Sequence, residues 1–488
     1  MRRHMHIGSK LKLSRVAVGM LALLVAVQVL PPFFGLHSPF GSVTGLQTQN
    51  DPTACEAIGN NWTSCQDAFS SNDVYAYAND TGGGGGGGAF KVQRGMSVIP
   101  TSQASVTITA GTDYVAPASL PRAFIRIVGT RLSGNGDDTG QASPAPPEEW
   151  MTSISNPGNL LTSITFERYL ASTTDTTRLY WEILEDTGPT GGANEFLVRD
   201  QAEIEQTTGA SMDGGSVAPT DDADVVVFIT GQRGDGSNSG LTDQALYTAE
   251  WVAASDLPRF TRGDGTGSAS VSYAVVEFTG SNWKVQRAEH TYGASGVEET
   301  ETITAVNSLT RTFLHAQMRT ASGAIDEMGQ RVRLASTTTV GFQLRSGAGI
   351  FSQVGVAWVM ENTQTDGTPM NVQRVSGTRA SGGGNPEEWT ETISAVADLT
   401  TASIMGETSD SSGTGNSAPR GVIGLNLTAT TTVTLWRADG GTINDYRLEV
   451  VEWPTAAGGG GGGPGKNDTA WRDFGFALSG SITQVEVG

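Results

Sequence analysis

The amino-acid sequence predicts an all-β fold of tandem antiparallel β-sandwich modules, immunoglobulin-like or jelly-roll-like, joined by short or glycine-rich linkers. Short segments alternate apolar and polar residues and are rich in Val, Ile, Thr and aromatic residues, which favours strands. Clusters of Gly, Asn, Asp, Ser and Pro separate these segments roughly every ten residues, as turns do in a sandwich. Four short signatures recur in one order along the chain. A helical period is confined to the stretch from Gln244 to Ala254.

The composition limits the classes of function. Apolar residues make up 37% and charged residues 16% of the 488 residues, which is enough for packed cores and unlike a disordered chain. Fifty acidic against 30 basic residues give a net charge of −20, which argues against nucleic-acid binding because that needs a basic surface. Five His and two Cys nearly exclude a Cys/His metal cluster. We find no enzyme motif and expect no cofactor.

The N-terminus has the pattern of an export signal. A basic start is followed by the apolar stretch from Val16 to Leu30, which ends at Pro31. The stretch is short for a membrane-spanning helix, although Phe33 and Leu36 would extend it into an uncleaved anchor. The segment is therefore predicted to be a signal peptide or a signal-anchor. We expect an extracellular or cell-surface protein that meets the membrane only through this segment.

Export affects how the two cysteines and the glycosylation sequons are interpreted. Cys55 and Cys65 lie close together in a chain expected in an oxidising compartment, which favours a local disulfide; two unpaired buried thiols are the alternative. N-x-S/T sequons, the acceptor pattern for N-glycosylation, occur at Asn61, Asn79, Asn426 and Asn467.

The middle of the chain is repetitive. The first signature is V-Q-R, which ends at Arg94, Arg287 and Arg374, with a weaker copy at Arg199. The last is an apolar strand that closes on Glu185, Glu277, Glu361 and Glu452. Between them lie an I-T-A or I-S-A strand at Ile108, Ile303 and Ile393, and a strand that ends in Arg168, Arg262, Arg345 and Arg437. Recurrence at roughly 90 residues indicates tandem modules. Aromatic residues in three closing strands are candidate core anchors: Trp181, Tyr273 and Trp358.

These signatures and two glycine runs, which we interpret as flexible linkers, divide the chain. The predicted parts are a signal peptide or signal-anchor (1–36), the N-terminal part of a candidate split β domain (37–81), a poly-Gly linker (82–88), four β-sandwich repeats (89–185, 186–278, 279–361 and 362–453), a Gly-rich linker (454–465), and the C-terminal strands of the candidate split domain (466–488).

The order V-Q-R-G, I-T-A, Φ-x-R and W-x-V-V-E, where Φ is an apolar residue, resembles tandem β-sandwich repeats of environmental surface proteins and phage virion proteins. The resemblance covers roughly residues 89–453. The second repeat departs most, because it lacks Gln before Arg199 and has a longer middle. The resemblance implies a structural or adhesive scaffold and carries over no catalytic residue.

The two ends of the chain resemble parts of one jelly-roll-like domain interrupted by the repeats. Seven glycines reach at most about 25 Å when fully extended, whereas four modules in a straight rod would hold the ends much further apart. The modules therefore fold back on each other, or the half-domains pair between molecules and make head-to-tail filaments. Two unrelated tails are a further alternative. The candidate self-assembly strand contains Phe474, Phe476, Ile482, Val485 and Val487.

Several other motifs are better explained by structure than by function. The RGD tripeptides at Arg233 and Arg262 contain arginines that the repeats account for. Acidic loops at 221–224 and 235–240 make Ca²⁺ a weak candidate, because neither has the spacing of a calcium loop. Trp150 and Trp389 could stack on sugar rings, but a core or rim position is the favoured interpretation.

The sequence therefore favours a secreted or cell-surface structural or adhesive protein, with self-association or glycan ligands as its expected partners and the option of extracellular filaments. One alternative is a carbohydrate-binding protein or the non-catalytic part of a secreted hydrolase. Another is a virion or tail-fibre-like protein, which the export signal argues against.

Overall fold

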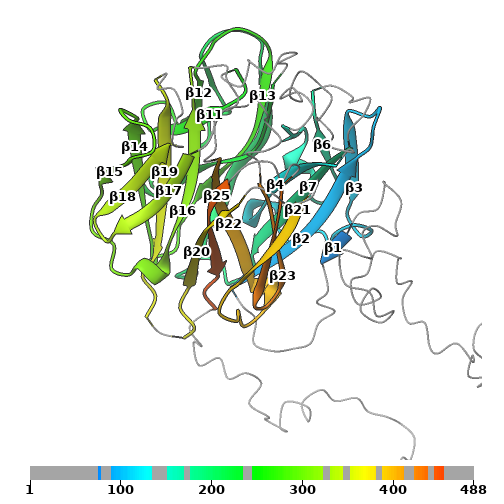
Figure 1. The fold of residues 1–488 in the computed structure, drawn as a ribbon. Coiled ribbons are helices and arrows are strands. Elements are labelled where there is room, and N and C mark those ends of the chain that lie inside the picture. Colours follow the sequence, from blue (N-terminus) through cyan, green and yellow to red (C-terminus); the bar gives the residue numbers. More distant parts are fainter. Residues whose placement is uncertain are drawn as a thin grey trace, which may run out of the picture. The chain divides into compact units, whose positions relative to one another are not determined.

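The computed structural model describes residues 75–77, 89–133, 151–169, 176–234, 244–321, 330–344, 352–365, 367–380, 387–410, 423–437 and 444–455. These residues form antiparallel strands and short 3₁₀ turns, so the predicted all-β class of tandem sandwiches is confirmed (Figure 1). Within the described part, no helix is long and apolar enough to span a membrane.

Six strands occur in each repeat. The first repeat contains β2 (Phe90–Ile99), β3 (Ser105–Thr109), β4 (Ala123–Ser133), β5 (Ser153–Ile154), β6 (Ser163–Glu167) and β7 (Thr176–Asp186), with 3₁₀ turns η1 (Leu120–Arg122) and η2 (Pro157–Asn159). The second contains β8 (Leu197–Gln206), β9 (Ser211–Asp213), η3 (Asp222–Asp224), β10 (Val225–Gly234), β11 (Tyr247–Val252), β12 (Leu257–Arg262) and β13 (Ala269–Glu277).

The other two repeats follow the same plan. The third contains β14 (Trp283–Thr291), β15 (Glu298–Thr302), η5 (Leu309–Arg311), β16 (Thr312–Arg319), β17 (Gln330–Ser336), β18 (Thr339–Leu344) and β19 (Val354–Asn362). The fourth contains β20 (Asn371–Arg379), β21 (Glu387–Thr392), η7 (Leu399–Thr401), β22 (Ala402–Asp410), β23 (Ile423–Ala429), β24 (Thr432–Arg437) and β25 (Asn444–Glu452).

The strands of each repeat form two three-stranded sheets. The first, sixth and third strands make the inner sheet, in the orders β2-β7-β4, β8-β13-β10, β14-β19-β16 and β20-β25-β22. The second, fifth and fourth strands make the outer sheet, in the orders β3-β6-β5, β9-β12-β11, β15-β18-β17 and β21-β24-β23. The first four strands thus alternate between sheets. An immunoglobulin fold keeps its first two strands in one sheet, so the observed order is that of a short jelly roll.

Alternation along the sixth strand divides its side chains between two cores. Trp181 lies in the core of the first sandwich, while Leu184 on the opposite face joins a second core. Trp358, a candidate core anchor, is buried as expected, but it lies in the second core and not between the two sheets of its own repeat. Its neighbours Ala357 and Val359 occupy the third repeat's own core, so Trp358 points to the other face of the sheet.

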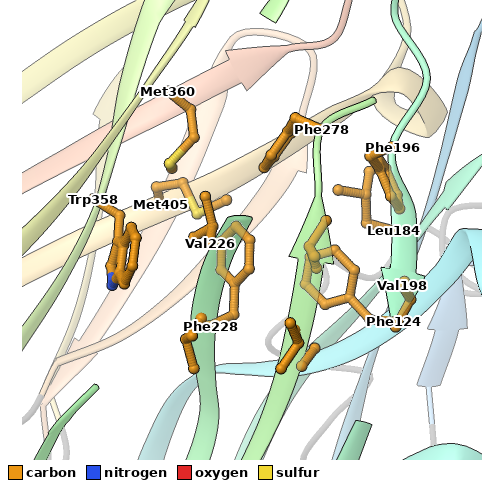
Figure 2. Close-up of a cluster of buried hydrophobic side chains, with 14 of the residues drawn as sticks. Phe124, Leu184, Phe196, Val198, Val226, Phe228, Phe278, Trp358, Met360 and Met405 are labelled. Carbon is orange, nitrogen blue, oxygen red and sulfur yellow. The ribbon is translucent and has the colours of Figure 1, made fainter. Parts of the chain in front are cut away.

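We call that second core the central core, because all four repeats contribute to it (Figure 2). For this reason the central strands β13 and β19 of two inner sheets are buried along their whole length. Large side chains in the central core include Phe90 and Phe124 from the first repeat, Phe196, Phe228 and Phe278 from the second, Trp283, Phe313 and Trp358 from the third, and Met405 and Trp453 from the fourth.

One contact recurs at the junctions and closes the repeats into a ring. The first strand of each repeat packs against the 3₁₀ turn before the third strand of the preceding repeat: β8 on η1, β14 on η3 and β20 on η5. In the same way β2 of the first repeat packs on η7 of the fourth. Of the arrangements expected from the sequence, the straight rod is therefore not adopted; the repeats fold back on each other.

The chain enters and leaves this ring at one place. The rings of Phe90 and Trp453 lie 5.0 Å apart. Beside them, side-chain amides connect the linkers between repeats: Asn194 Oδ1 accepts from Asn282 Nδ2 at 2.8 Å. Gln364 Nε2 donates to the carbonyl of Thr455, the last described residue, at 3.1 Å.

Two segments differ from their expected assignment. The stretch with a helical period forms β11 instead, because pairing of β11 with β12 satisfies its backbone inside a sheet. β1 (Tyr75–Tyr77), expected in the candidate split domain, pairs antiparallel with β2 and extends the first inner sheet by a fourth strand.

Candidate functional site: the repeat junctions and the central cavity

The Gln of the V-Q-R signature holds a loop of its own repeat. Gln93 both donates to and accepts from the backbone of Val115, at 2.8 Å in each case. Gln286 Nε2 donates to the Thr304 carbonyl at 3.0 Å, and Gln373 Nε2 donates to the Ser394 carbonyl at 2.8 Å. The side chain thereby ties the first strand to the segment between the second and third strands.

The Arg of the same signature reaches the 3₁₀ turn of the preceding repeat at two junctions. Arg374 donates to the carbonyl oxygens of Leu309, at 2.7 Å, and Thr312 in and after η5. Arg94 donates to the equivalent carbonyls of the fourth repeat, Leu399 at 2.9 Å and Ala402. The residues that identify the repeat in the sequence therefore also join one repeat to the next.

The second repeat, which has the weakest signature, uses an amide for this contact. Gln201 Nε2 donates to the carbonyl of Ala123 in the first repeat at 3.2 Å. In the third repeat Arg287 reaches the second repeat at another place: it donates to the carbonyl of Ala249 in β11 at 3.3 Å and lies over the ring of Trp358. The four junctions thus share a position but differ in chemistry.

The closing Glu of each repeat fixes the loop that carries the 3₁₀ turn. Glu185 accepts from the Ala118 N–H at 2.6 Å and Glu452 from the Ala397 N–H at 2.8 Å. The other two closing carboxylates accept from pairs of N–H groups: Glu277 from Thr220 and Asp221, and Glu361 from Asn307 and Ser308. Charge-assisted bonds to backbone N–H groups are stronger than neutral ones, so these loops are held firmly.

The Arg that ends the fifth strand is a buried structural residue. Arg262 is 1% exposed and donates to the carbonyls of Gly209, Gln244 and Gly267, each at 3.0 Å. Arg168 is fully buried and holds the Pro100 and Gln103 carbonyls in the same manner. Arg345 lies outside the described residues. Because its guanidinium is enclosed, Arg262 is not free to present its RGD tripeptide to a receptor.

A carboxylate lies beside the Arg at each of the two junctions that Arg94 and Arg374 form. Glu182 accepts from Arg126 at 2.8 Å, lies 3.5 Å from Arg94, and accepts from the N–H of Ile404 in the fourth repeat. Glu449 accepts from Arg374 at 2.7 Å and from the N–H of Leu314 in the third repeat at 2.8 Å. Burial raises the pKa of Glu449, while Arg374 and the Leu314 N–H oppose the rise.

The third strands converge at the centre of the ring. Their fourth residues, each four positions after the last residue of the 3₁₀ turn, are Arg126, Phe228, His315 and Met405. The rings of Phe228 and His315 lie 4.8 Å apart, and Arg126 Nη1 lies 2.7 Å from Met405 Sδ. One structural position thus holds a cation, an aromatic ring, an imidazole and a thioether.

A cavity of about 370 Å³ adjoins these residues. Its apolar lining includes Ile127, Ile229, Leu314, Val332, Leu334, Ile404 and Leu448. Its charged or titratable lining consists of Arg126, His315, Arg333, Arg374, Arg447 and Glu449. The side chain of Arg333 is 47% exposed, so the cavity reaches solvent there.

His315 is neutral in this setting. Burial lowers the pKa of His315 to about 3, and the positive charge of Arg126 contributes to the decrease. Nε2 accepts from the Ile229 N–H at 3.2 Å, which requires that nitrogen to be unprotonated. The charged groups that line the same cavity are Arg126, Arg333, Arg374, Arg447 and Glu449.

The His315 environment predicts acid sensitivity. The unfolded chain binds a proton at this residue near pH 6.5, whereas the folded chain binds it only near pH 3. Stability is therefore lost as pH falls below about 6.5, by about 2 kcal/mol between pH 7 and pH 5. Denaturant unfolding at both pH values measures this loss. The raised pKa of Glu449 acts in the opposite direction, so the His315 contribution is the difference between wild type and His315→Gln. An equal loss in both proteins would refute this role for His315.

The site residues predicted from the sequence lie mostly outside the described residues. This applies to Cys55, Cys65, Asn61, Asn79 and Asn467, and to the C-terminal strand residues Phe474, Phe476, Ile482, Val485 and Val487. Asn426 lies in β23 and is 9% exposed.

The other motifs weighed in the sequence have structural roles where they are described. Asp221 caps η3 by accepting from the Ala223 N–H, and Asp222 accepts from Trp251 Nε1 at 2.7 Å. Trp389 is 8% exposed and lies within 6 Å of the guanidinium groups of Arg379 and Arg437, so it offers no open face to a sugar. Trp150 lies outside the described residues. Among the described residues, no cluster of three His, Cys, Asp or Glu side chains is arranged to hold a metal ion.

Sequence reasoning missed the central cavity. Its third-strand residues differ in every repeat, so no recurring letter marks them; the available signal was their constant distance from the 3₁₀ turn. Comparisons with protein-family models, curated proteins and solved structures found no match.

Proposed function

We propose that the protein is an exported structural or adhesive scaffold of a cell surface or extracellular assembly, in which the four repeats form one rigid head. The observation that supports this proposal is that the recurring residues hold the protein's own structure together. The V-Q-R glutamine and the closing glutamate fasten loops within a repeat, and Arg94 and Arg374 fasten one repeat to another. A chain whose repeated residues serve its own assembly is suited to a mechanical or display role.

The ring supports a head carried by flanking segments of the same molecule. Both glycine runs connect to the ring where Phe90 and Trp453 meet. Segments 37–81 and 466–488 can therefore approach each other without a second chain. We propose that the flanks associate within one molecule and link the head to its attachment point. Filaments through exchanged C-terminal strands are the competing arrangement.

Light scattering and electron microscopy on residues 37–488 test this proposal, with and without Ca²⁺. We expect compact monomers whose oligomeric state and shape do not change when residues 466–488 are deleted. Concentration-dependent filaments that disappear on this deletion would replace the monomeric head by an intermolecular polymer. Thermal stabilisation by sugars would instead support the carbohydrate-binding alternative.

A further inference from the structure

We propose that the central cavity binds a small organic anion, a carboxylate carried on an apolar body. This inference is independent of the scaffold role. It depends on the charges of the cavity, on one hydrogen-bond donor without an acceptor, and on the apolar lining.

The charges beside the cavity leave one cation in excess. Arg333 makes a bidentate pair with Glu298, with distances of 2.7 and 2.6 Å. Arg331 pairs with Asp445 at 3.0 Å. Arg447 Nη2 lies 3.5 Å from Glu298 Oε2, and both carboxylate oxygens of Glu298 already accept hydrogen bonds from Arg333. Among the described side chains, these three guanidinium groups therefore share two carboxylates.

Of the other charges that line the cavity, Arg374 pairs with Glu449, whereas Arg126 shares Glu182 with Arg94. His315 accepts a backbone N–H and is neutral. Positive charge therefore exceeds negative charge on both sides of the cavity, at Arg447 and at the Arg94–Arg126 pair.

Arg447 also has an unused donor. Its Nη1 is buried and has no hydrogen-bond partner among the described residues. Leaving a buried charged donor unsatisfied costs more than a typical hydrogen bond gains. Burial and the neighbouring cations Arg331 and Arg333 lower the pKa of Arg447, as expected where an anion is missing. A carboxylate would supply both the acceptor and the missing charge.

The lining selects an apolar body for this anion. Val332, Leu334, Ile404 and Leu448 line the same cavity as Arg447. Its volume of about 370 Å³ lies in the range of small-molecule sites. A fully hydrated ion such as phosphate would leave this apolar surface uncovered, whereas a ring or short chain would cover it.

Titration calorimetry on the full chain tests the proposal with sodium benzoate as the probe. Benzyl alcohol has a similar body without charge, and inorganic phosphate has charge without the body. We expect saturable binding of benzoate, with benzyl alcohol and phosphate at least tenfold weaker. A benzoate concentration of about 10 mM is ample to detect binding at a site of this class. The proposal would be overturned if no benzoate bound at that concentration, or if phosphate bound as tightly as benzoate.

Variants that change the charge in opposite directions test the assignment to Arg447. Arg447→Met is expected to weaken benzoate binding at least tenfold. We expect this variant to fold, because Arg333 still pairs with Glu298. Glu298→Gln removes a competing carboxylate and is expected to tighten binding. Arg259→Met, which alters an exposed pair with Asp213, serves as the control and should change nothing. Unchanged affinity in both cavity variants would overturn the assignment, and melting curves confirm that each variant is folded.

Discussion

Glu182→Ala is expected to lower the free energy of unfolding by about 3–5 kcal/mol, because it leaves two buried arginines without their shared carboxylate. Glu182 is 3% exposed and lies between Arg94 and Arg126. It also accepts from the Ile404 N–H across the junction of the first and fourth repeats. Denaturant unfolding at neutral pH measures the change, which should appear as a lower midpoint.

Glu250→Ala is the matched control for this substitution. Glu250 lies 4.0 Å from Arg259 and both side chains are exposed, so its loss should cost less than about 1 kcal/mol. The pair of variants separates a buried ion network from an exposed one. Equal midpoints for Glu182→Ala and Glu250→Ala would show that the junction does not depend on this carboxylate.

Trp453→Ala is expected to destabilise the chain by about 3–5 kcal/mol and to loosen the first repeat, which is far away in the sequence. Trp453 is 1% exposed and follows β25. Its ring lies 5.0 Å from Phe90 and 5.2 Å from Phe313, and its Nε1 donates to Ser403 Oγ at 2.9 Å. Hydrogen exchange should therefore become faster in β2 as well as in the fourth repeat.

Trp389→Ala provides the comparison, since Trp389 belongs to the fourth repeat's own core. Its removal should speed exchange in the outer sheet of that repeat and leave β2 nearly unchanged. If Trp453→Ala also left the exchange of β2 unchanged, the central core would not couple the first and fourth repeats.

The fold class was predictable from the sequence because its signals are local. Strand alternation and turn residues can be read without knowing what packs where, and they identified tandem antiparallel sandwiches. Trp358 shows the limit of such reasoning. One residue of offset relative to Trp181 moves a side chain to the other face of the sheet. Composition does not reveal this offset in a strand that is buried on both faces.

The junctions were not predictable for a different reason. Arg94 and Arg374 were recognised as recurring residues, yet their acceptors are backbone carbonyls of Leu399, Ala402, Leu309 and Thr312. Every residue has a carbonyl, so no sequence feature marks the partner. Without these contacts, a rod and a ring are equally consistent with repeats of about 90 residues.

The four different residues at the centre of the ring show what is gained by carrying all repeats on one chain. Identical subunits around a rotation axis would present the same side chain four times. Four copies of Arg126 would repel one another, and four of Phe228 would leave no polar partner. Fusion removes this constraint of symmetry, since each repeat mutates separately. The centre can thus hold Arg126, Phe228, His315 and Met405 together, and the cavity that adjoins them is asymmetric.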